Sequence, residues 1–200
     1  FEFQTANLSG LLVLLTAAVW RYRDRRLAVA LAAGVLVALK LYGWPLIVFL
    51  LASRRIRAAV GAVLVAVGAA LIPWAVFGFR GLAGFPHLLN AMAHAEAREG
   101  YWIANLFTPL ASWSVAQGLA YTVGALLLAA SARVRDDRRT FVLCLGATLA
   151  LSPIVWMHYF VVLAVVLALR APRFGAIWLL PVALWFAPDS QQHPHGSALN

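Results

Sequence analysis

The chain has 200 residues, of which 64% are hydrophobic and 12% charged, and its mean hydropathy is +0.85. Soluble domains carry about 25% charged residues, and a soluble protein of this size has too little interior to bury so much apolar surface. The composition therefore excludes an ordinary soluble domain and predicts an all-α, multi-pass membrane protein. The net charge of +9 does not indicate a nucleic-acid partner, because the cations form short clusters between apolar runs, as in cytoplasmic loops.

Apolar runs alternate with charged segments along the whole chain. In chain order, the runs that predict helices in lipid are approximately 8–20, 27–53, 58–78, 112–132, 140–169 and 174–187. The run 58–78 has about 21 residues, which is enough to cross roughly 30 Å of hydrocarbon. The sequence thus predicts a transmembrane helical domain over 1–187, with an outer loop at 79–107 and a polar tail at 188–200.

The basic residues predict which loops face the cytoplasm. Thirteen of the 16 cations lie in four clusters, at 21–26, 54–57, 133–139 and 170–173. If all four are cytoplasmic, the runs 27–53 and 140–169 must each leave and return, although two full spans need about 40 residues. Each run is therefore expected to form a hairpin of two short helices or a broken helix. The chain then makes about eight crossings or half-crossings, with both of its ends outside.

Glycine and proline mark where the two broken runs turn, at Gly43/Pro45 and at Pro153. Backbone breaks within a membrane are tolerated only where protein or a water-filled cavity covers them. We therefore expect both apices to line a cavity near the outer boundary of the membrane. Four tryptophans fall at the same predicted boundary, where the indole ring is favoured: Trp44, Trp74, Trp156 and Trp185.

Three cations lie outside the clusters, on the predicted outer side: Lys40, Arg80 and Arg98. A cation near membrane depth is costly and marks a candidate site. Lys40, at the first apex, is expected either to contact a phosphate or to extend its ammonium group to the interface. Arg80 and Arg98 are each expected either to pair bidentately with a phosphate or to be ordinary interfacial arginines.

The second apex carries His158, followed by Tyr159. A histidine here is either a hydrogen-bonded structural residue or a donor to a phosphate or sugar hydroxyl. Between the apices, residues 85–99 predict an amphipathic helix on the outer surface. Its histidines share a face with no fixed carboxylate, so no metal is expected.

The remaining polar residues predict no further chemistry. Three aspartates, Asp24, Asp136 and Asp137, lie in arginine-rich loops and are expected to be charge partners. No close pair of carboxylates and no glycine-rich phosphate loop stands out, and no cofactor is expected. The single cysteine, Cys144, lies in an apolar run and is expected to be a small buried residue.

Several motifs occur in an order that resembles a known family. They are Gln4-Thr5-Ala6-Asn7, an apolar run ending in Lys40 with Pro45 soon after, an arginine-rich turn at 54–57, and Ser-Pro-x-x-Trp-x-His-Tyr at 152–159. In this order they resemble the bacterial polyprenol-phosphate-mannose-dependent mannosyltransferases of glycosyltransferase family 87, in the GT-C superfamily. The resemblance covers roughly residues 3–170.

The resemblance implies a GT-C-like enzyme of the bacterial plasma membrane. Such an enzyme moves mannose from a polyprenyl-phosphate donor to a glycan or glycolipid acceptor on the outer face, with inversion and without a nucleotide-sugar site. It implies donor or substrate contacts at Gln4, Asn7, Lys40, His158 and Tyr159. The family's general base is an acidic residue in an outer loop before the Gln-x-x-Asn element. No catalytic base is therefore assigned, and the chain is expected to be part of a longer protein.

Two other functions fit the same pattern of helices. Broken helices at a cavity also occur in transporters, so a transporter or lipid-linked-sugar flippase is the main alternative, although no inverted repeat is evident. A non-enzymatic membrane subunit would instead present a large apolar face to a partner and have no polar cavity between the apices.

Overall fold

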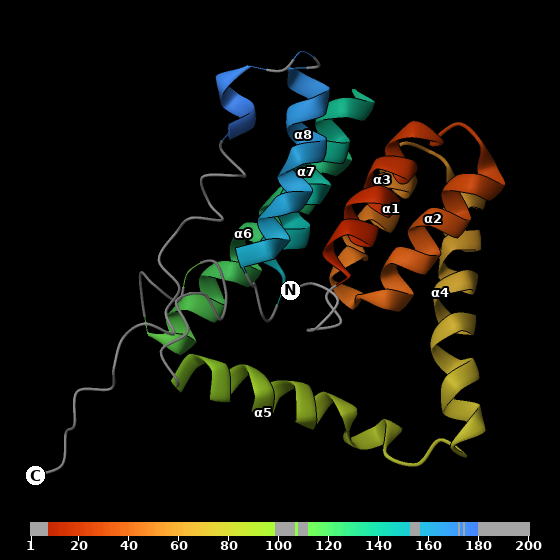
Figure 1. The fold of residues 1–200 in the computed structure, drawn as a ribbon, viewed down its shortest axis with the longest axis vertical. Helices are drawn as coiled ribbons and strands as arrows, with labels where there is room; N and C mark the ends of the chain where they lie inside the picture. The colour runs from red at the N-terminus through yellow and green to blue at the C-terminus, as the bar shows by residue number, and fades with distance from the viewer. Residues whose placement is uncertain are drawn as a thin grey trace, which may run out of the picture.

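The computed structural model describes residues 8–98, 107, 112–152, 157–171, 173 and 175–179 (Figure 1). Every regular element in these ranges is helical, which confirms the all-α prediction for them. The α-helices are α1 (Ser9–Arg21), α2 (Arg26–Leu39), α3 (Pro45–Ala52), α4 (Ile56–Val76), α5 (Phe85–Arg98), α6 (Trp113–Arg133), α7 (Asp137–Ala150) and α8 (Leu163–Arg170). Four short 3-10 turns complete them: η1 (Leu41–Gly43), η2 (Leu82–Gly84), η3 (Met157–Val162) and η4 (Ala176–Trp178).

Within the described ranges, two helices are long and apolar enough to cross a membrane, Ile56–Val76 and Ser114–Arg133. Only 17% and 22% of their most apolar windows are buried, whereas the core helix of a soluble protein would be mostly covered. The other helices are shorter. The eight residues of α3 span about 12 Å, less than half of a roughly 30 Å hydrocarbon core. The eight crossings or half-crossings therefore stay a prediction.

The run 27–53 turns where the sequence predicts. It forms α2 and α3, with η1 between them. Lys40 ends α2 in an extended conformation, with φ of −155° and ψ of 109°. Pro45 is the first residue of α3, where its missing N–H costs no hydrogen bond. In the run 140–169, α7 and η3 are separated by a segment that includes Pro153, which lies outside the described residues.

Small residues let α2 and α4 pack at close range. A Cβ added to Gly34 would lie 2.5 Å from Val65 Cβ and 2.7 Å from the Ala62 carbonyl oxygen. Around this point both helices bury alanines, including Ala33 and Ala62, which are fully buried. This is the small-residue packing by which helices associate in membranes, where close backbone approach replaces the hydrophobic drive.

Aromatic rings join the other helices of the bundle. Phe49 of α3 and Phe141 of α7 meet edge to face, with ring centroids 5.2 Å apart. Trp20 of α1 lies 5.1 Å from the same Phe141 ring. Cys144, one turn further along α7, is fully buried, as predicted. The three rings therefore hold α1, α3 and α7 together close to their charged ends.

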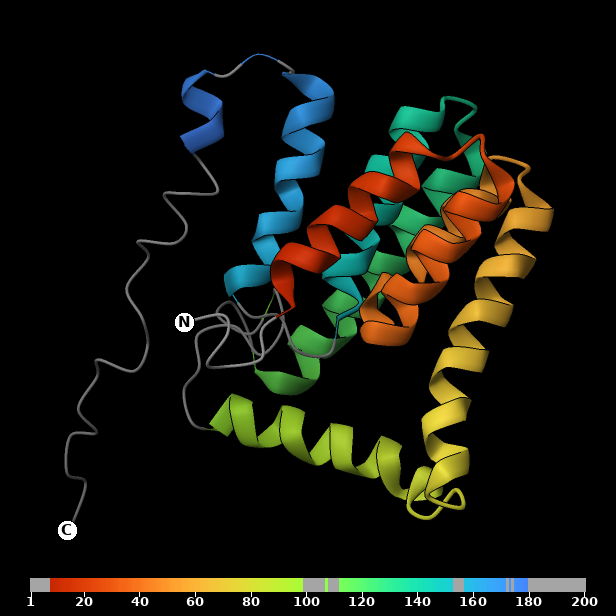
Figure 2. The same ribbon diagram turned by 45° about the vertical axis from the view of Figure 1, so that its right-hand side comes forward.

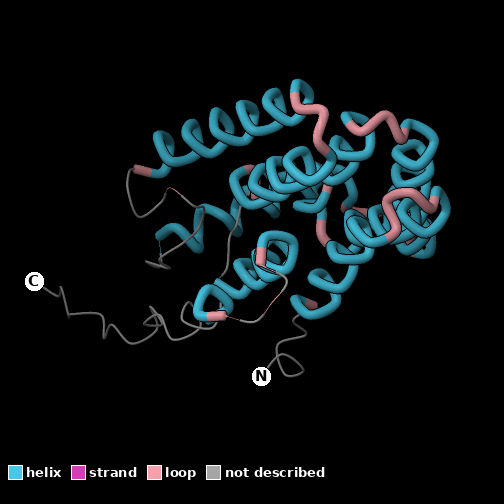
Figure 3. The backbone as a smooth tube through the Cα atoms, turned by 90° about the horizontal axis from the view of Figure 1, so that it is seen from above, coloured by secondary structure: helices cyan, strands magenta, loops and turns pink. Residues whose placement is uncertain are grey.

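The bundle has two different ends. The turns α1–α2, α3–α4 and α6–α7 and the end of α8 lie at the upper end in Figure 1, and Figure 3 looks down on it. At the lower end, α5 runs across the bundle between α4 and α6 (Figures 1 and 2). The four basic clusters therefore lie at the upper end, and the predicted helix at 85–99 is present as α5 at the opposite end.

Candidate functional site

Two residues far apart in the sequence meet where the broken runs turn. Lys40 ends α2 and is half-buried, and Tyr159 lies in η3 with 7% of its surface exposed. The Lys40 ammonium nitrogen lies 3.6 Å from the centroid of the Tyr159 ring. This distance is well within the roughly 6 Å over which an aromatic face attracts a cation. The structure thus joins the Lys40-to-Pro45 apex to the Ser-Pro-x-x-Trp-x-His-Tyr motif.

The ring contact has a chemical consequence for Lys40. An ammonium group carries three donors on a flexible stem, so its position in a site depends on what holds it. The nearly buried Tyr159 ring provides a fixed surface for the cation, at a helix end that itself has no acidic residue nearby in sequence. A cation held in this way is suited to bind a phosphate or a developing anionic leaving group.

The other residues of the second motif are only partly described. Ser152 is 3% exposed at the end of α7. The backbone of His158 lies in η3, directly before Tyr159, and its side chain lies outside what the structure describes. Gln4 and Asn7 also lie outside the described residues. The structure therefore places the backbone of His158 beside the Lys40 contact, and the positions of Gln4 and Asn7 stay predictions.

The two candidate arginines lie at opposite ends of α5. Arg80 is exposed in the turn before η2, and Arg98 is the last residue of α5, with only its backbone described. A helix of 14 residues is about 21 Å long. The α4–α5 turn forms the corner of the molecule away from α8 (Figures 1 and 2). The structure therefore does not bring Arg80 to the Lys40–Tyr159 contact.

A compact ion-pair network lies at the opposite end of the bundle. Arg55 Nη2 donates to Asp24 Oδ1 at 2.6 Å and to Asp137 Oδ2 at 2.7 Å. Arg23 Nε lies 3.6 Å from the same Asp137 oxygen, with its guanidinium carbon 4.3 Å above the Trp20 ring. One arginine thus ties the α1–α2 turn to the start of α7.

Two of the three aspartates have the predicted role of charge partner, and the third caps a helix instead. Asp24 and Asp137 are charge partners of Arg55, and Asp136 caps α7 by accepting a hydrogen bond of 2.7 Å from the Arg139 backbone N–H. The hydrogen bond from Arg55 lowers the pKa of Asp137, and the same bond raises the pKa of Arg55. The sequence did not reveal that one arginine, Arg55, pairs with aspartates from two different loops. The only available signal was that each of those arginine-rich loops carries an acid.

The described residues contain no group of three or more histidine, cysteine, aspartate or glutamate side chains that could hold a metal ion. At the Lys40 end, the described side chains place a cation against the face of a tyrosine ring. A cation held in this way can bind and polarise a phosphate group.

Comparison with known proteins adds an independent finding. The model of glycosyltransferase family 87 matches residues 1–155, which include the first apex, the arginine network and the beginning of the second motif. No curated protein and no solved structure compared with the chain matches it. Members of this family are membrane-associated glycosyltransferases. Because the family model covers most of the chain, this chain belongs to glycosyltransferase family 87.

Proposed function

We propose that this glycosyltransferase moves mannose from a polyprenyl-phosphate donor to a glycan or glycolipid acceptor on the outer face of a bacterial plasma membrane. The observation that supports this most is the contact of Lys40 with Tyr159, at 3.6 Å. This contact brings Lys40, the cation of the first apex, against the Ser-Pro-x-x-Trp-x-His-Tyr motif, the most distinctive motif of the sequence.

The arrangement of charges supports the outer location. The Lys40–Tyr159 contact and the arginine-rich turns belong to opposite ends of α2, whose first residue is Arg26. If the arginine-rich end faces the cytoplasm, the Lys40 end faces outward. The phosphate of a lipid-linked donor lies at that boundary while its prenyl chain stays in the hydrocarbon. Lys40 is then at the depth where the phosphate needs a positive partner.

In the proposed reaction the acceptor hydroxyl oxygen forms a bond to the anomeric carbon of the donor sugar. The bond between that carbon and the phosphate oxygen breaks, and polyprenyl phosphate leaves with the electron pair. The hydroxyl proton passes to a carboxylate base, which the resemblance assigns to an outer loop before Gln4. Lys40, with His158, binds the phosphate and stabilises the negative charge that grows on it, and Tyr159 positions Lys40. Gln4 and Asn7 are proposed to contact the donor or the sugar.

Membership of a glycosyltransferase family favours transfer over transport. A flippase moves the whole lipid-linked sugar and leaves the bond to phosphate intact, whereas a transferase breaks it. The alternatives therefore differ in the product, and a chemical assay separates them. The third possibility, a non-enzymatic subunit, gives neither product.

The test uses purified full-length protein in liposomes, so that no other enzyme interconverts donors. Radiolabelled polyprenyl-phosphate mannose and, separately, a nucleotide-linked mannose are supplied with a range of glycan and glycolipid acceptors. We expect label to reach the acceptor only from the lipid-linked donor, and Lys40→Ala and His158→Ala to reduce the transfer. Arg135→Ala, which removes an exposed cation at the other end of the bundle, is the matched control and should transfer like wild type. Label that crosses the bilayer still attached to its lipid would support the flippase and overturn the proposal.

A further inference from the structure

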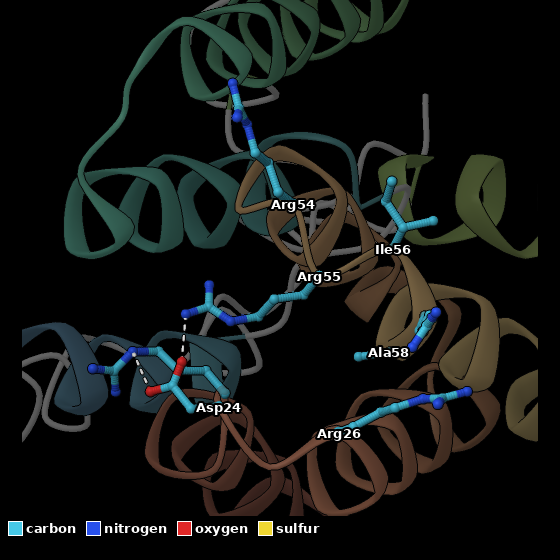
Figure 4. Close-up of a pocket in the computed structure, with 8 residues that line it drawn as sticks. Asp24, Arg26, Arg54, Arg55, Ile56 and Ala58 are labelled. Atoms are coloured by element: carbon cyan, nitrogen blue, oxygen red, sulfur yellow. Dashed lines mark hydrogen bonds and ion pairs between the residues drawn. The ribbon is translucent and has the colours of Figure 1, made fainter.

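An open pocket of about 490 Å³ lies at the arginine-rich end, away from Lys40 (Figure 4). It is formed where the α1–α2 turn meets the α3–α4 turn. Ile56 and Ala58 line it together with one aspartate, Asp24, and five arginines: Arg23, Arg26, Arg54, Arg55 and Arg57. The excess of positive side chains makes it a site for an anion.

Two helices begin at this pocket, α2 at Arg26 and α4 at Ile56. Neither has a side-chain cap or an acidic residue in its first turn. The first N–H groups of a helix lack partners within it, and the positive end of its dipole favours an anion. Arg26 and Arg57 add positive charge to these first turns, where a cation is unfavourable without a counter-ion. An anion in the pocket would relieve this repulsion at both helices.

Arg55 is one of the residues that line the pocket. Its Nη2 reaches Asp24, as Figure 4 shows, and Asp137. Its Nη1 is buried and has no hydrogen-bond partner among the described residues. Arg55 is therefore held in place by two carboxylates, and its fixed guanidinium adds positive charge to the lining of the pocket. Arg54, by contrast, extends to the other side of the turn in Figure 4, away from Asp24.

The border of the pocket is apolar. Ile56 lines it and is 61% exposed, and neighbouring positions on the two helices are also open, with Leu27 77% and Val60 53% exposed. A soluble phosphate compound would gain nothing from these side chains. A phospholipid could place its phosphate among the arginines and its acyl chains along α2 and α4.

We propose that this pocket binds the phosphate group of an anionic phospholipid, on the face opposite the Lys40 contact. Basic pockets between membrane helices on the cytoplasmic side are suited to such head groups. The inference uses the membrane association of the family and does not depend on which sugar donor the enzyme takes.

The test measures lipid binding to the delipidated full-length protein in detergent, by native mass spectrometry. The probes are phosphatidylglycerol, with zwitterionic phosphatidylcholine for comparison, and sn-glycerol 3-phosphate as a soluble source of the same chemistry. The variant Arg26→Gln with Arg57→Gln removes two exposed pocket charges and leaves the Arg55 network intact. Its matched control is Arg135→Gln with Arg139→Gln, which removes two exposed charges at the same end outside the pocket.

We expect wild type to prefer phosphatidylglycerol, and the pocket variant to lose about tenfold or more of that affinity. The control variant should change by less than roughly threefold, since salt screens exposed charges that lie outside the pocket. Equal losses in the two variants, or a pocket variant that binds like wild type, would overturn the proposal. If glycerol 3-phosphate binds as tightly as the lipid, the proposal that the ligand is a phospholipid is overturned, and the pocket is instead a site for a soluble phosphate compound.

Discussion

The Lys40 ammonium nitrogen lies 3.6 Å from the centroid of the Tyr159 ring, although the two residues belong to different broken runs. The contact joins the end of α2 to η3 and therefore connects two motifs that the sequence alone leaves separate. In the proposed function, the ring fixes the cation that binds the donor phosphate.

Tyr159 substitutions test whether the ring positions Lys40. Tyr159→Phe keeps an aromatic face and removes the hydroxyl, whereas Tyr159→Leu removes the face as well. A cation–π contact contributes about 0.5 to 2 kcal/mol, so the Leu variant should have a donor kcat/KM about two- to thirtyfold below that of the Phe variant. Comparing the two variants with each other cancels any effect of the hydroxyl. Equal values in donor-saturation kinetics would mean that the ring does not act on Lys40.

The pairs of Arg55 predict an unequal effect of two similar substitutions. Asp137 is 36% exposed and Asp24 is 68% exposed, so the Asp137 pair is better shielded from water. Asp137→Asn should lower the free energy of unfolding by about 1 to 2 kcal/mol, and Asp24→Asn by less than about 1 kcal/mol. Thermal unfolding of both variants in detergent checks the order. A larger effect at Asp24 would contradict it.

The same pair predicts how stability depends on pH. The hydrogen bond from Arg55 lowers the pKa of Asp137 below its ordinary value of 3.8. A carboxylate whose pKa is lower in the folded than in the unfolded protein stabilises the fold at any pH above its unfolded-state pKa. This stability is lost as the pH falls through the folded-state pKa. The melting temperature of wild type should therefore drop below about pH 4 more steeply than that of Asp137→Asn. Parallel curves for the two proteins would show that this carboxylate is not linked to folding.

Gly34 is predicted to be intolerant of even one methyl group. Its added Cβ would meet the Ala62 backbone oxygen at 2.7 Å, and a backbone atom cannot turn aside, so α2 and α4 must separate. We expect Gly34→Ala to cost about 1 to 3 kcal/mol of stability. Gly68→Ala in α4 is the matched control, because nothing lies within 4 Å of the added atom, and it should be neutral or stabilising. Similar melting temperatures for the two variants would contradict the close packing.

Arg54 occupies a conformation that favours glycine. It has φ of +59°, and the hydrogen bonds Arg54 N–H to Leu51 O, at 2.9 Å, and Arg55 N–H to Leu50 O, at 2.8 Å, form the Schellman motif that ends α3. Arg54→Gly should stabilise the protein by about 0.5 to 1 kcal/mol. Glycine removes the steric cost of the left-handed conformation, and this gain exceeds the cost of the greater conformational entropy that glycine gives the unfolded chain. Arg54→Ala removes the same charge but keeps the Cβ, so it should melt below the Gly variant. The reverse order would assign the effect to charge.

The sequence predicts the local structure well because its strongest signals are local. Proline and glycine mark the turn before α3. The apolar runs predict the helices, and the arginine clusters predict which turns lie at the same end of the bundle. The pairing of Lys40 with Tyr159 and of Arg55 with two aspartates depends on which helices pack together, and no local signal fixes that. Arg80 shows the converse, since its charge alone suggests a site while α4 and α5 hold it at a distant corner. The number of crossings is harder still, because helices of 8 to 14 residues do not fix a membrane depth.

The most direct test of the proposed donor site is the donor dependence of transfer by Lys40→Ala, measured in liposomes with folding verified by its melting temperature. A hydrogen bond to a charged group is worth about 1.5 to 3 kcal/mol, so the kcat/KM for polyprenyl-phosphate mannose should fall about 10- to 150-fold. Lys40→Arg, which keeps a cation, should recover part of the loss, and Arg135→Ala should match wild type. A Lys40→Ala protein that transfers within about twofold of wild type would contradict the account, since the donor phosphate would then not depend on this cation.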